Sequence, residues 1–418
     1  MRTFDRSERR SAATSLLLAR IVYAFNWFNI GAVLPILGRQ LPASTFELGL
    51  ILGAFLLGAG VFQVPAGIAA LRWGNRTVSI FALFLMAAFS LASAFSPNWI
   101  VLALLRFGAG AGASFFFAPA LGLVTSFYPV GARGPVIGLY NAGFSIGSGA
   151  GLFGGALVGE WFGWPAALLV GGVLLLAVAI LGLLKLPRPT LAPERREWRR
   201  IWNATTPVLR SRSIWALSVG TAGLWAAYYI AAQYFIDFTS SVHPGWSTAL
   251  AAALPTVMIV LEIPGGPLGG WLGERAGEMQ RQLLYWGIAC GVGILLIPYV
   301  PILGLVALFA FLGFADGIVF AILYLLPSYL PETHGETLTL GVSFIDSIQI
   351  FLGSGLAIAF GYLAEVDGYT VAWWFAGGIA LAPLTLLFWV GDRRERAASL
   401  AIPRPAVARP VRVPNRPR

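Results

Sequence analysis

The sequence predicts an all-α membrane protein in which twelve transmembrane helices form two six-helix bundles. Three observations support this fold class. First, the 418-residue chain is 58% hydrophobic and only 11% charged, whereas a soluble protein carries charge on about a quarter of its residues. Second, the apolar residues fall into twelve runs, each long enough for a membrane helix. Third, the first six runs are echoed by the last six.

The twelve runs are long enough because a membrane helix needs about 20 mostly apolar residues. We predict spans near 15–37, 46–71, 77–95, 99–126, 136–159, 165–186, 213–236, 247–272, 282–299, 302–327, 338–363 and 370–391. One long polar segment separates the sixth and seventh spans. A second polar segment follows the twelfth span, is rich in Arg and Pro, and has too little apolar surface to fold. The expected organisation is a cytoplasmic N-terminus (1–14), a first bundle (15–186), a cytoplasmic linker (187–212), a second bundle (213–391) and a disordered basic cytoplasmic tail (392–418).

The placement of the arginines predicts the orientation, because cytoplasmic loops carry the excess of basic residues. The 28 basic residues are all Arg except Lys185. With the N-terminus inside, the outer loops hold only Arg39, together with several acids. We therefore expect a multi-pass protein of the cell membrane, inner or plasma, with both termini in the cytoplasm. The net charge of +10 is spread over many loops, so it does not predict a nucleic-acid partner.

Short phrases recur in the two halves, in the same order and about 200 residues apart. "FQVPAG" (62–67) matches "LEIPGG" (261–266), and "IGSG" (146–149) matches "LGSG" (352–355). Two parallel repeats of six helices place a binding site at their interface, near the middle of the membrane. The first pair of phrases differs at one chemically important position, where Gln63 corresponds to Glu262.

Loop and helix motifs are similar to those of a known family. The loop "GIAALRWGNR" (67–76) and its counterpart "GWLGERAG" (270–277) are similar to an inner-loop signature, with Leu71 in place of the usual Asp. "RFGAGAG" (106–112) and "GSGAGLFGG" (147–155) are similar to motifs of the fourth and fifth spans. The chain thus resembles the major facilitator superfamily over nearly its whole length. The resemblance implies a rocker-type transporter whose inner side is gated by Gly67, Arg72, Gly74, Arg76, Gly270, Glu274, Arg275 and Gly277.

Five ionisable residues lie deep inside predicted spans: Arg20, Arg106, Glu262, Asp316 and Asp346. A charge at the centre of a membrane helix costs about 2.5–3.5 kcal/mol, so such residues imply function by default. A carboxyl in a low-dielectric site favours its protonated form and can load and release protons. The amide of Gln63 cannot do so. These six residues are candidates for binding substrate or protons.

Polar and small residues at helical spacing extend the candidate site. Trp225, Tyr229 and Gln233 lie at steps of four and suit a cavity wall, although aromatic residues near span ends also anchor helices at the membrane surface. Asn26 and Asn29 either line the cavity or bridge helices. The glycines at every fourth position from 143 to 159 predict tight packing between the bundles.

We expect a secondary transporter that works by alternating access and is coupled to protons. Acids in the second half favour efflux of lipophilic or cationic compounds, and the resemblance of 147–155 to a motif of exporters tilts the expectation slightly toward efflux. Arg20 and Arg106 favour the alternative, which is proton-coupled uptake of a small organic anion. A non-transporting receptor or scaffold is a third alternative. An enzyme is not expected, because the sequence shows no nucleophile–base pair. The expected partners are a small-molecule substrate, protons and the lipid bilayer, with a monomer, no cofactor and no metal; His243 and His334 lie in loops on opposite sides.

Overall fold

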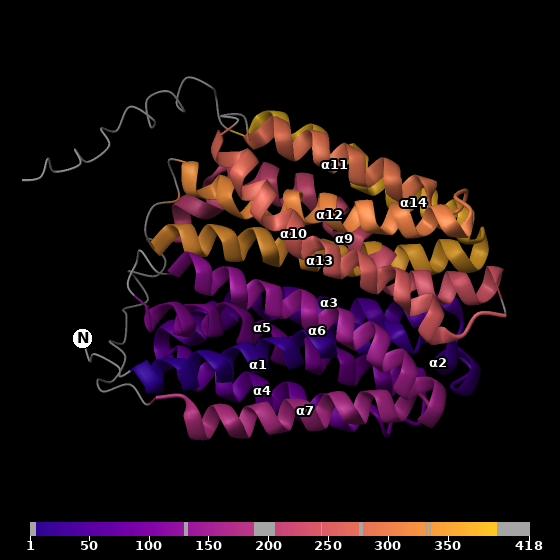
Figure 1. Ribbon diagram of the computed structural model, residues 1–418, viewed down its shortest axis with the longest axis horizontal. Coiled ribbons are helices and arrows are strands. Elements are labelled where there is room, and N and C mark those ends of the chain that lie inside the picture. Colours follow the sequence, from indigo (N-terminus) through magenta and orange to yellow (C-terminus); the bar gives the residue numbers. More distant parts are fainter. Residues whose placement is uncertain are drawn as a thin grey trace, which may run out of the picture.

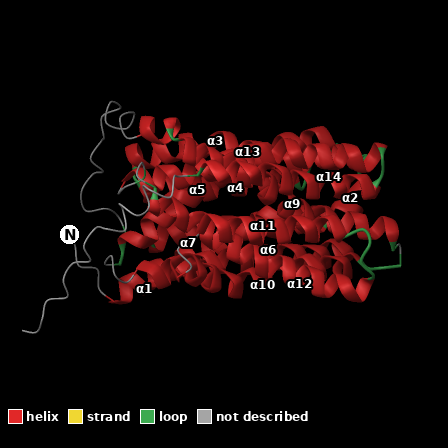
Figure 2. Ribbon diagram, turned by 90° about the horizontal axis from the view of Figure 1, so that it is seen from above, coloured by secondary structure: helices red, strands yellow, loops and turns green. Residues whose placement is uncertain are grey.

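The computed structural model describes residues 6–128, 133–187, 205–243, 245–275, 279–330, 333 and 336–390. Almost all of these residues are helical, and the described part of the chain contains no strand. The all-α prediction is confirmed. Figure 2 shows the helices running side by side along the length of the molecule.

The first half of the chain contains seven helices in its described residues. They are α1 (Arg6–Ala32), α2 (Leu34–Gln40), α3 (Thr45–Trp73), α4 (Asn75–Ser93), α5 (Trp99–Ser126), α6 (Arg133–Phe162) and α7 (Trp164–Lys185). The axes of α1 and α2 differ by 52°. Pro35 explains the bend, because it lacks the N–H that would continue the hydrogen-bond ladder of α1. The two helices therefore form one bent span.

After a short helical segment at 205–210, the described part of the second half contains six α-helices and two short 3₁₀ helices. They are α9 (Arg212–Val242), α10 (Thr248–Arg275), α11 (Met279–Leu296), α12 (Ile302–Leu325), η2 (Leu326–Tyr329), α13 (Glu336–Val366), α14 (Tyr369–Leu381) and η3 (Ala382–Trp389). Among the described residues, ten helices are long and apolar enough to cross a membrane, and the bent α1–α2 pair makes eleven. The remaining predicted span corresponds to α11, which has 18 residues.

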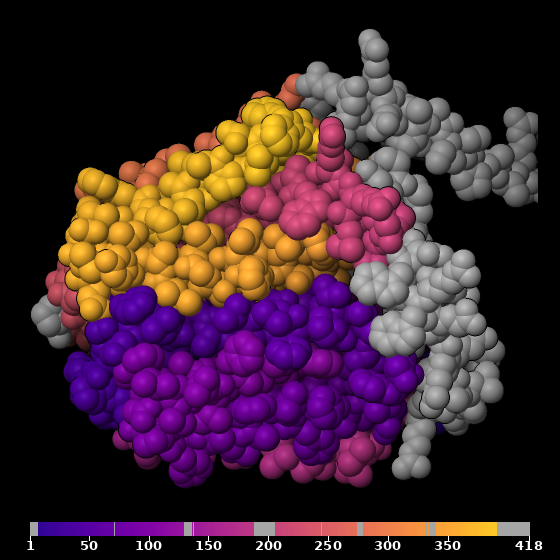
Figure 3. All heavy atoms as spheres, turned by 180° about the vertical axis from the view of Figure 1, so that it is seen from behind, coloured from indigo at the N-terminus to yellow at the C-terminus, as the bar shows by residue number. Residues whose placement is uncertain are grey.

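The two halves lie side by side, with the first half in indigo to magenta and the second in rose to yellow (Figure 1). Two helix pairs join them, and we call these pairs seams. The first seam is α3 against α13, and the second is α6 against α10. Figure 3 shows the colours of the two halves meeting along a continuous line on the opposite face. We call the end of the molecule where α1 begins the terminal end, and the other the distal end.

At the distal end, each seam is fastened by a glutamate that reaches across to the other half. Glu365 of α13 accepts a hydrogen bond from the backbone N–H of Phe46 at 2.7 Å. Glu160 of α6 accepts one from the backbone N–H of Ala249 at 3.0 Å. Both acceptors satisfy N–H groups in the first turn of a helix, where negative charge is also favoured by the helix dipole. The two halves therefore cap each other's helices in the same way.

Close helix approach depends on glycine at several crossings. A Cβ at Gly147 of α6 would lie 2.0 Å from the carbonyl oxygen of Ile21 on α1. The glycine stripe of α6 thus packs against α1 within the same half, and the prediction that it packs between the bundles is wrong. Between the halves, close approach occurs on α3, where a Cβ at Gly60 would lie 2.8 Å from the backbone nitrogen of Phe351.

Candidate functional site

A small cavity lies between the two halves, with a volume of about 70 Å³. This is less than the roughly 150 Å³ that holds a benzene ring in an engineered cavity, so an organic solute can enter only if the halves move. Aromatic rings dominate the wall. The lining residues are Trp27, Phe28, Phe144, Thr221, Leu224, Trp225, Tyr228, Tyr229, Glu262, Asp316, Val319, Phe320, Leu323 and Gln349.

Glu262 and Asp316 face this cavity from neighbouring helices. The backbones of α10 and α12 cross closely, since a Cβ at Gly317 would lie 2.3 Å from the carbonyl oxygen of Glu262. Glu262 accepts only long hydrogen bonds, from Tyr228 at 3.4 Å and Ser145 at 3.5 Å. Asp316 has no hydrogen-bond partner among the described residues. Two weakly bonded carboxyls that share a largely apolar cavity are suited to holding a proton between them.

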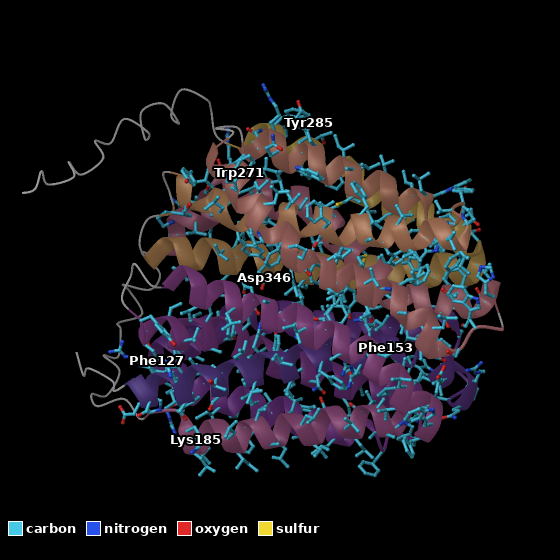
Figure 4. All side chains as sticks on the ribbon, viewed as in Figure 1. Phe127, Phe153, Lys185, Trp271, Tyr285 and Asp346 are labelled. Atoms are coloured by element: carbon cyan, nitrogen blue, oxygen red, sulfur yellow. The ribbon has the colours of Figure 1, made fainter. Side chains whose placement is uncertain are left out.

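Asp346 of α13 is placed differently, at the first seam. Its two carboxylate oxygens accept hydrogen bonds of 3.0 Å from Gln63 of α3 and Tyr324 of α12. Its neighbour Ser347 donates to the carbonyl oxygen of Gly60 at 3.0 Å. Figure 4 shows Asp346 at the boundary between the two halves. Asp346 and Gln63 therefore form a hydrogen-bonded junction across the seam and do not line the cavity.

Arg106 of α5 is a fully buried cation without an acidic partner among the described residues. Its exposed fraction is 0%, and its guanidinium carbon lies 4.4 Å from the centre of the Phe55 ring. Nη2 donates to the carbonyl oxygen of Asn26 at 3.2 Å, but Nε and Nη1 find no partner in the part of the chain that the structure describes. Tyr229, which lines the cavity, lies within electrostatic range of Arg106. An unpaired guanidinium at this depth is suited to an anionic ligand.

Arg20 of α1 is also buried, at 6% exposure. Its guanidinium carbon lies 4.5–5.1 Å from four ring centres, which belong to Tyr23, Phe117, Tyr140 and Phe144. No residue that the structure describes forms a hydrogen bond with its Nε. Such cation–π contacts hold a desolvated cation without neutralising it.

The predicted polar positions of α9 and α1 divide into two groups. Trp225 and Tyr229 stack, with ring centres 5.6 Å apart, and both line the cavity. Gln233 instead donates to the carbonyl oxygen of Trp27 at 3.0 Å, which joins the two halves. Asn26 and Asn29 donate to backbone carbonyls of α7 at 3.1 and 3.4 Å. Of the two alternatives for these asparagines, the structure supports the bridging of helices.

The predicted gating loop has a local structural role in the described residues. Gly74, with φ of 84°, adopts a backbone conformation that favours glycine and joins α3 to α4. Arg76 donates to the carbonyl oxygens of Leu183 and Leu186, both at 3.0 Å, and so caps α7 in its own half. A Cβ at Gly67 or at Gly270 would meet no atom within 4 Å. Gly277 and the side chains of Leu71, Glu274 and Arg275 lie outside the described residues, as does His334.

Sequence reasoning missed several residues that the structure brings to the site. Ser145 and Tyr228 contact Glu262, and Tyr324 contacts Asp346. Phe144 lines the cavity and also lies over Arg20. Aromatic residues make up 13% of the chain, so no single ring stands out by spacing alone. The signal that could have found Phe144 and Tyr140 is their spacing of four residues on the glycine-rich face of α6.

Comparison with known proteins identifies the family. Residues 16–354 match the family model described as the Major Facilitator Superfamily. The chain is 28% identical over 227 residues to a 4-hydroxybenzoate transporter of Pseudomonas aeruginosa, over 48% of this chain and 51% of the relative. It is 28% identical over 337 residues to monocarboxylate transporter 13 of Rattus norvegicus, over 77% and 74%. A gallate transporter of Pseudomonas putida is 30% identical, over 39% and 37%. The chain thus aligns with about half the length of the first of these relatives.

Solved structures share the fold. A bacterial homologue of the human lysosomal transporter Spinster, in an inward-facing and occupied conformation, superposes with a TM-score of 0.68. The alignment covers 95% of this chain and 98% of that one at 16% sequence identity.

Proposed function

The chain belongs to the major facilitator superfamily, and from this premise we propose that it is a transporter that carries small aromatic carboxylates across the membrane together with protons. The membrane is the cell membrane, with the terminal end in the cytoplasm, as the arginine bias predicts. Within this proposal, the first and second halves of the chain are the two bundles that rock about the cavity.

One observation carries the proposal, namely the buried and unpaired guanidinium of Arg106. Two of its nitrogens lack hydrogen-bond partners, and leaving donors of a buried charge unpaired is costly. A carboxylate accepts from a guanidinium through two parallel bonds. The hydroxyl of Tyr229 and the indole N–H of Trp27 also lack partners in the described part of the chain. Both residues line the cavity, and Tyr229 lies within electrostatic range of Arg106, which supports an anion on this side of the cavity.

The shape and lining of the cavity favour a flat ring between polar ends. Phe28, Phe144 and the stacked Trp225–Tyr229 pair provide apolar faces. At the other side, Glu262, Asp316 and the side-chain oxygen of Gln349 offer acceptors, which suit a ring hydroxyl. The names of the relatives include 4-hydroxybenzoate, gallate and monocarboxylate transporters. These names agree with the chemistry of the wall.

Glu262 and Asp316 are the proposed proton site. Their weak hydrogen bonding leaves them free to exchange protons, whereas Asp346 is fully bonded at the first seam. Co-transport of a proton with a carboxylate moves no net charge. Efflux of cations, which the acids of the second half favour in the sequence, fits these surroundings less well. It would leave both buried arginines without a counter-charge.

Uptake into proteoliposomes tests the proposal. Purified protein should take up radiolabelled 4-hydroxybenzoate or gallate when the outside is acidic, and Arg106→Gln should abolish this uptake. Arg39→Gln removes an exposed arginine at the distal end and serves as the matched control, with uptake unchanged. If the wild-type protein moves lipophilic cations and no carboxylate, the proposal is wrong.

A further inference from the structure

The four aromatic rings of Tyr23, Phe117, Tyr140 and Phe144 form a cage around Arg20, and this cage also contains a buried hydroxyl group. The hydroxyl of Tyr140 is buried and has no hydrogen-bond partner among the described residues, and the Tyr140 ring centre lies 5.1 Å from the guanidinium carbon. Tyr140 is 2% exposed and Arg20 is 6% exposed. Two unsatisfied donors, the Tyr140 hydroxyl and Arg20 Nε, therefore occupy one desolvated place. Native proteins seldom leave such groups unpaired unless a ligand, ion or water completes them.

This place is separate from the Arg106 side of the cavity. Arg106 lies seven residues from the start of α5 at the distal end, whereas Arg20 lies fourteen residues from the start of α1 at the terminal end. Phe144 stands between Arg20 and the cavity. Its ring centre lies 4.5 Å from the Arg20 guanidinium carbon, and the same residue lines the cavity. The ring of Phe144 therefore separates the Arg20 guanidinium from the cavity.

The surroundings of Arg20 favour an incoming acceptor over an internal partner. Asp346 is within electrostatic range of Arg20, but both of its oxygens are already engaged by Gln63 and Tyr324. Glu262 is also within range, and it faces the cavity with Tyr228 and Ser145. No carboxylate of the described residues reaches the guanidinium within ion-pair distance.

Resting on the proposed function, we propose that Arg20 and the Tyr140 hydroxyl form a second carboxylate subsite, on the terminal side of the cavity. The substrate carboxylate leaves Arg106, passes Phe144 and is held by Arg20 before release at the terminal end. The same subsite receives substrate that enters from that end. The four rings keep Arg20 charged and in place when the subsite is empty.

Transport measured separately from each face tests this inference. Right-side-out and inside-out vesicles containing the full chain present opposite faces to radiolabelled 4-hydroxybenzoate. Tyr140→Phe removes one hydroxyl and keeps the ring over Arg20, so a purely structural cage would not respond to it. It should raise the half-saturating concentration at the terminal face about tenfold, as expected for one hydrogen bond to a charged group. At the distal face the change should be less than about twofold.

Two further variants complete the test. Arg20→Gln should raise the half-saturating concentration at the terminal face more than Tyr140→Phe does. Arg20→Lys keeps the positive charge and should raise it less than Arg20→Gln, and if Arg20→Gln does not fold, Arg20→Lys is compared with the wild type directly. The second subsite would be overturned if Tyr140→Phe left the half-saturating concentration unchanged at both faces or raised it equally at both. Either result would leave carboxylate transport in place. A wild-type protein that transports no carboxylate from either face would overturn the proposed function itself.

Discussion

The two seams between the halves use the same repeated phrase for different purposes. At the first seam, Gln63 of "FQVPAG" bonds Asp346 across the interface at 3.0 Å. At the second seam, Glu262 of "LEIPGG" reaches Ser145 only at 3.5 Å and faces the cavity. At the first seam each carboxylate oxygen of Asp346 accepts a 3.0 Å hydrogen bond, whereas at the second seam Glu262 accepts only weak ones among the described residues. The comparison indicates that two repeats can keep the same backbone arrangement while their side chains differ in role. Gln63 in the first copy holds the two halves together, and Glu262 in the second copy faces the cavity.

The helices are also packed more tightly at the first seam than at the second. At the first seam, α3 lies so close to α13 that a Cβ at Gly60 would lie 2.8 Å from the Phe351 nitrogen. At the second seam, a Cβ at Gly149 of α6 would make an ordinary contact, 3.4 Å from Thr256. The looser seam is the one that carries the proposed proton site. A carboxyl that must exchange protons needs room for water, and tight packing would deny it.

The largest effect should come from neutralising the weakly bonded acid. Glu262→Gln mimics a permanently protonated carboxyl, so uphill uptake driven by a pH gradient should fall to background. Counterflow of labelled substrate against unlabelled substrate should persist, because exchange needs no net proton movement. Both are measured in proteoliposomes, with Arg39→Gln as the control. Gradient-driven accumulation at the wild-type level in Glu262→Gln would remove the proposed difference between the seams.

Truncation at the first seam should act on stability. Asp346→Ala leaves the donors of Gln63 and Tyr324 unpaired, and each such buried group costs about 1–3 kcal/mol. We expect a clear drop in melting temperature in detergent, and a smaller drop for Asp346→Asn, whose side-chain oxygen can still accept one bond. A melting temperature unchanged in Asp346→Ala would show that the junction contributes little to cohesion.

Paired glycine substitutions sharpen the packing comparison. Gly60→Ala should destabilise the protein by about 1–3 kcal/mol, the usual cost of overpacking, because the obstacle is backbone of α13. Gly149→Ala should be nearly neutral, since its new methyl group meets side chains at ordinary distance. Thermal unfolding of the two variants side by side gives the difference. Equal effects would contradict the account of one tight and one loose seam.

Serine substitutions should give the smallest effects. Ser347→Ala removes a 3.0 Å bond to the Gly60 carbonyl, which is worth about 1 kcal/mol. Ser145→Ala removes only the 3.5 Å contact with Glu262, and it should cost less than about 0.5 kcal/mol, because hydrogen bonds of this length are weak. The order of the two melting shifts is the measurement. If Ser145→Ala lowered the melting temperature more than Ser347→Ala, the second seam would contribute more to stability than its geometry indicates.

The sequence predicts the helices well because hydrophobic length is a local property. Each of the twelve predicted spans overlaps a helix or the bent α1–α2 pair. The bend itself was missed, although Pro35 was its visible signal. The buried charges were also found, because a charge within an apolar run is conspicuous from neighbouring residues alone.

Contacts between helices could not be predicted in the same way. Gln63 and Asp346 are 283 residues apart in sequence, and only the packing of α3 on α13 brings them together. The glycine stripe of α6 indicates close packing against another helix but does not indicate which helix. The predicted partner was the other bundle, whereas the actual partner is α1. The opposite environments of Glu262 and Asp346 depend on Tyr228, Ser145 and Tyr324. No spacing rule links these residues to the acids.

Ligand-dependent thermal stability is the most direct test of the central claim that the site accepts aromatic carboxylates with protons. A ligand at 100 times its Kd that binds only the folded protein stabilises it by about 2.7 kcal/mol. We predict stabilisation by 4-hydroxybenzoate and gallate that is larger at pH 5.5 than at pH 7.5 and is lost in Arg106→Gln. Stabilisation by lipophilic cations that grows from pH 5.5 to pH 7.5, with none by carboxylates, would contradict the claim.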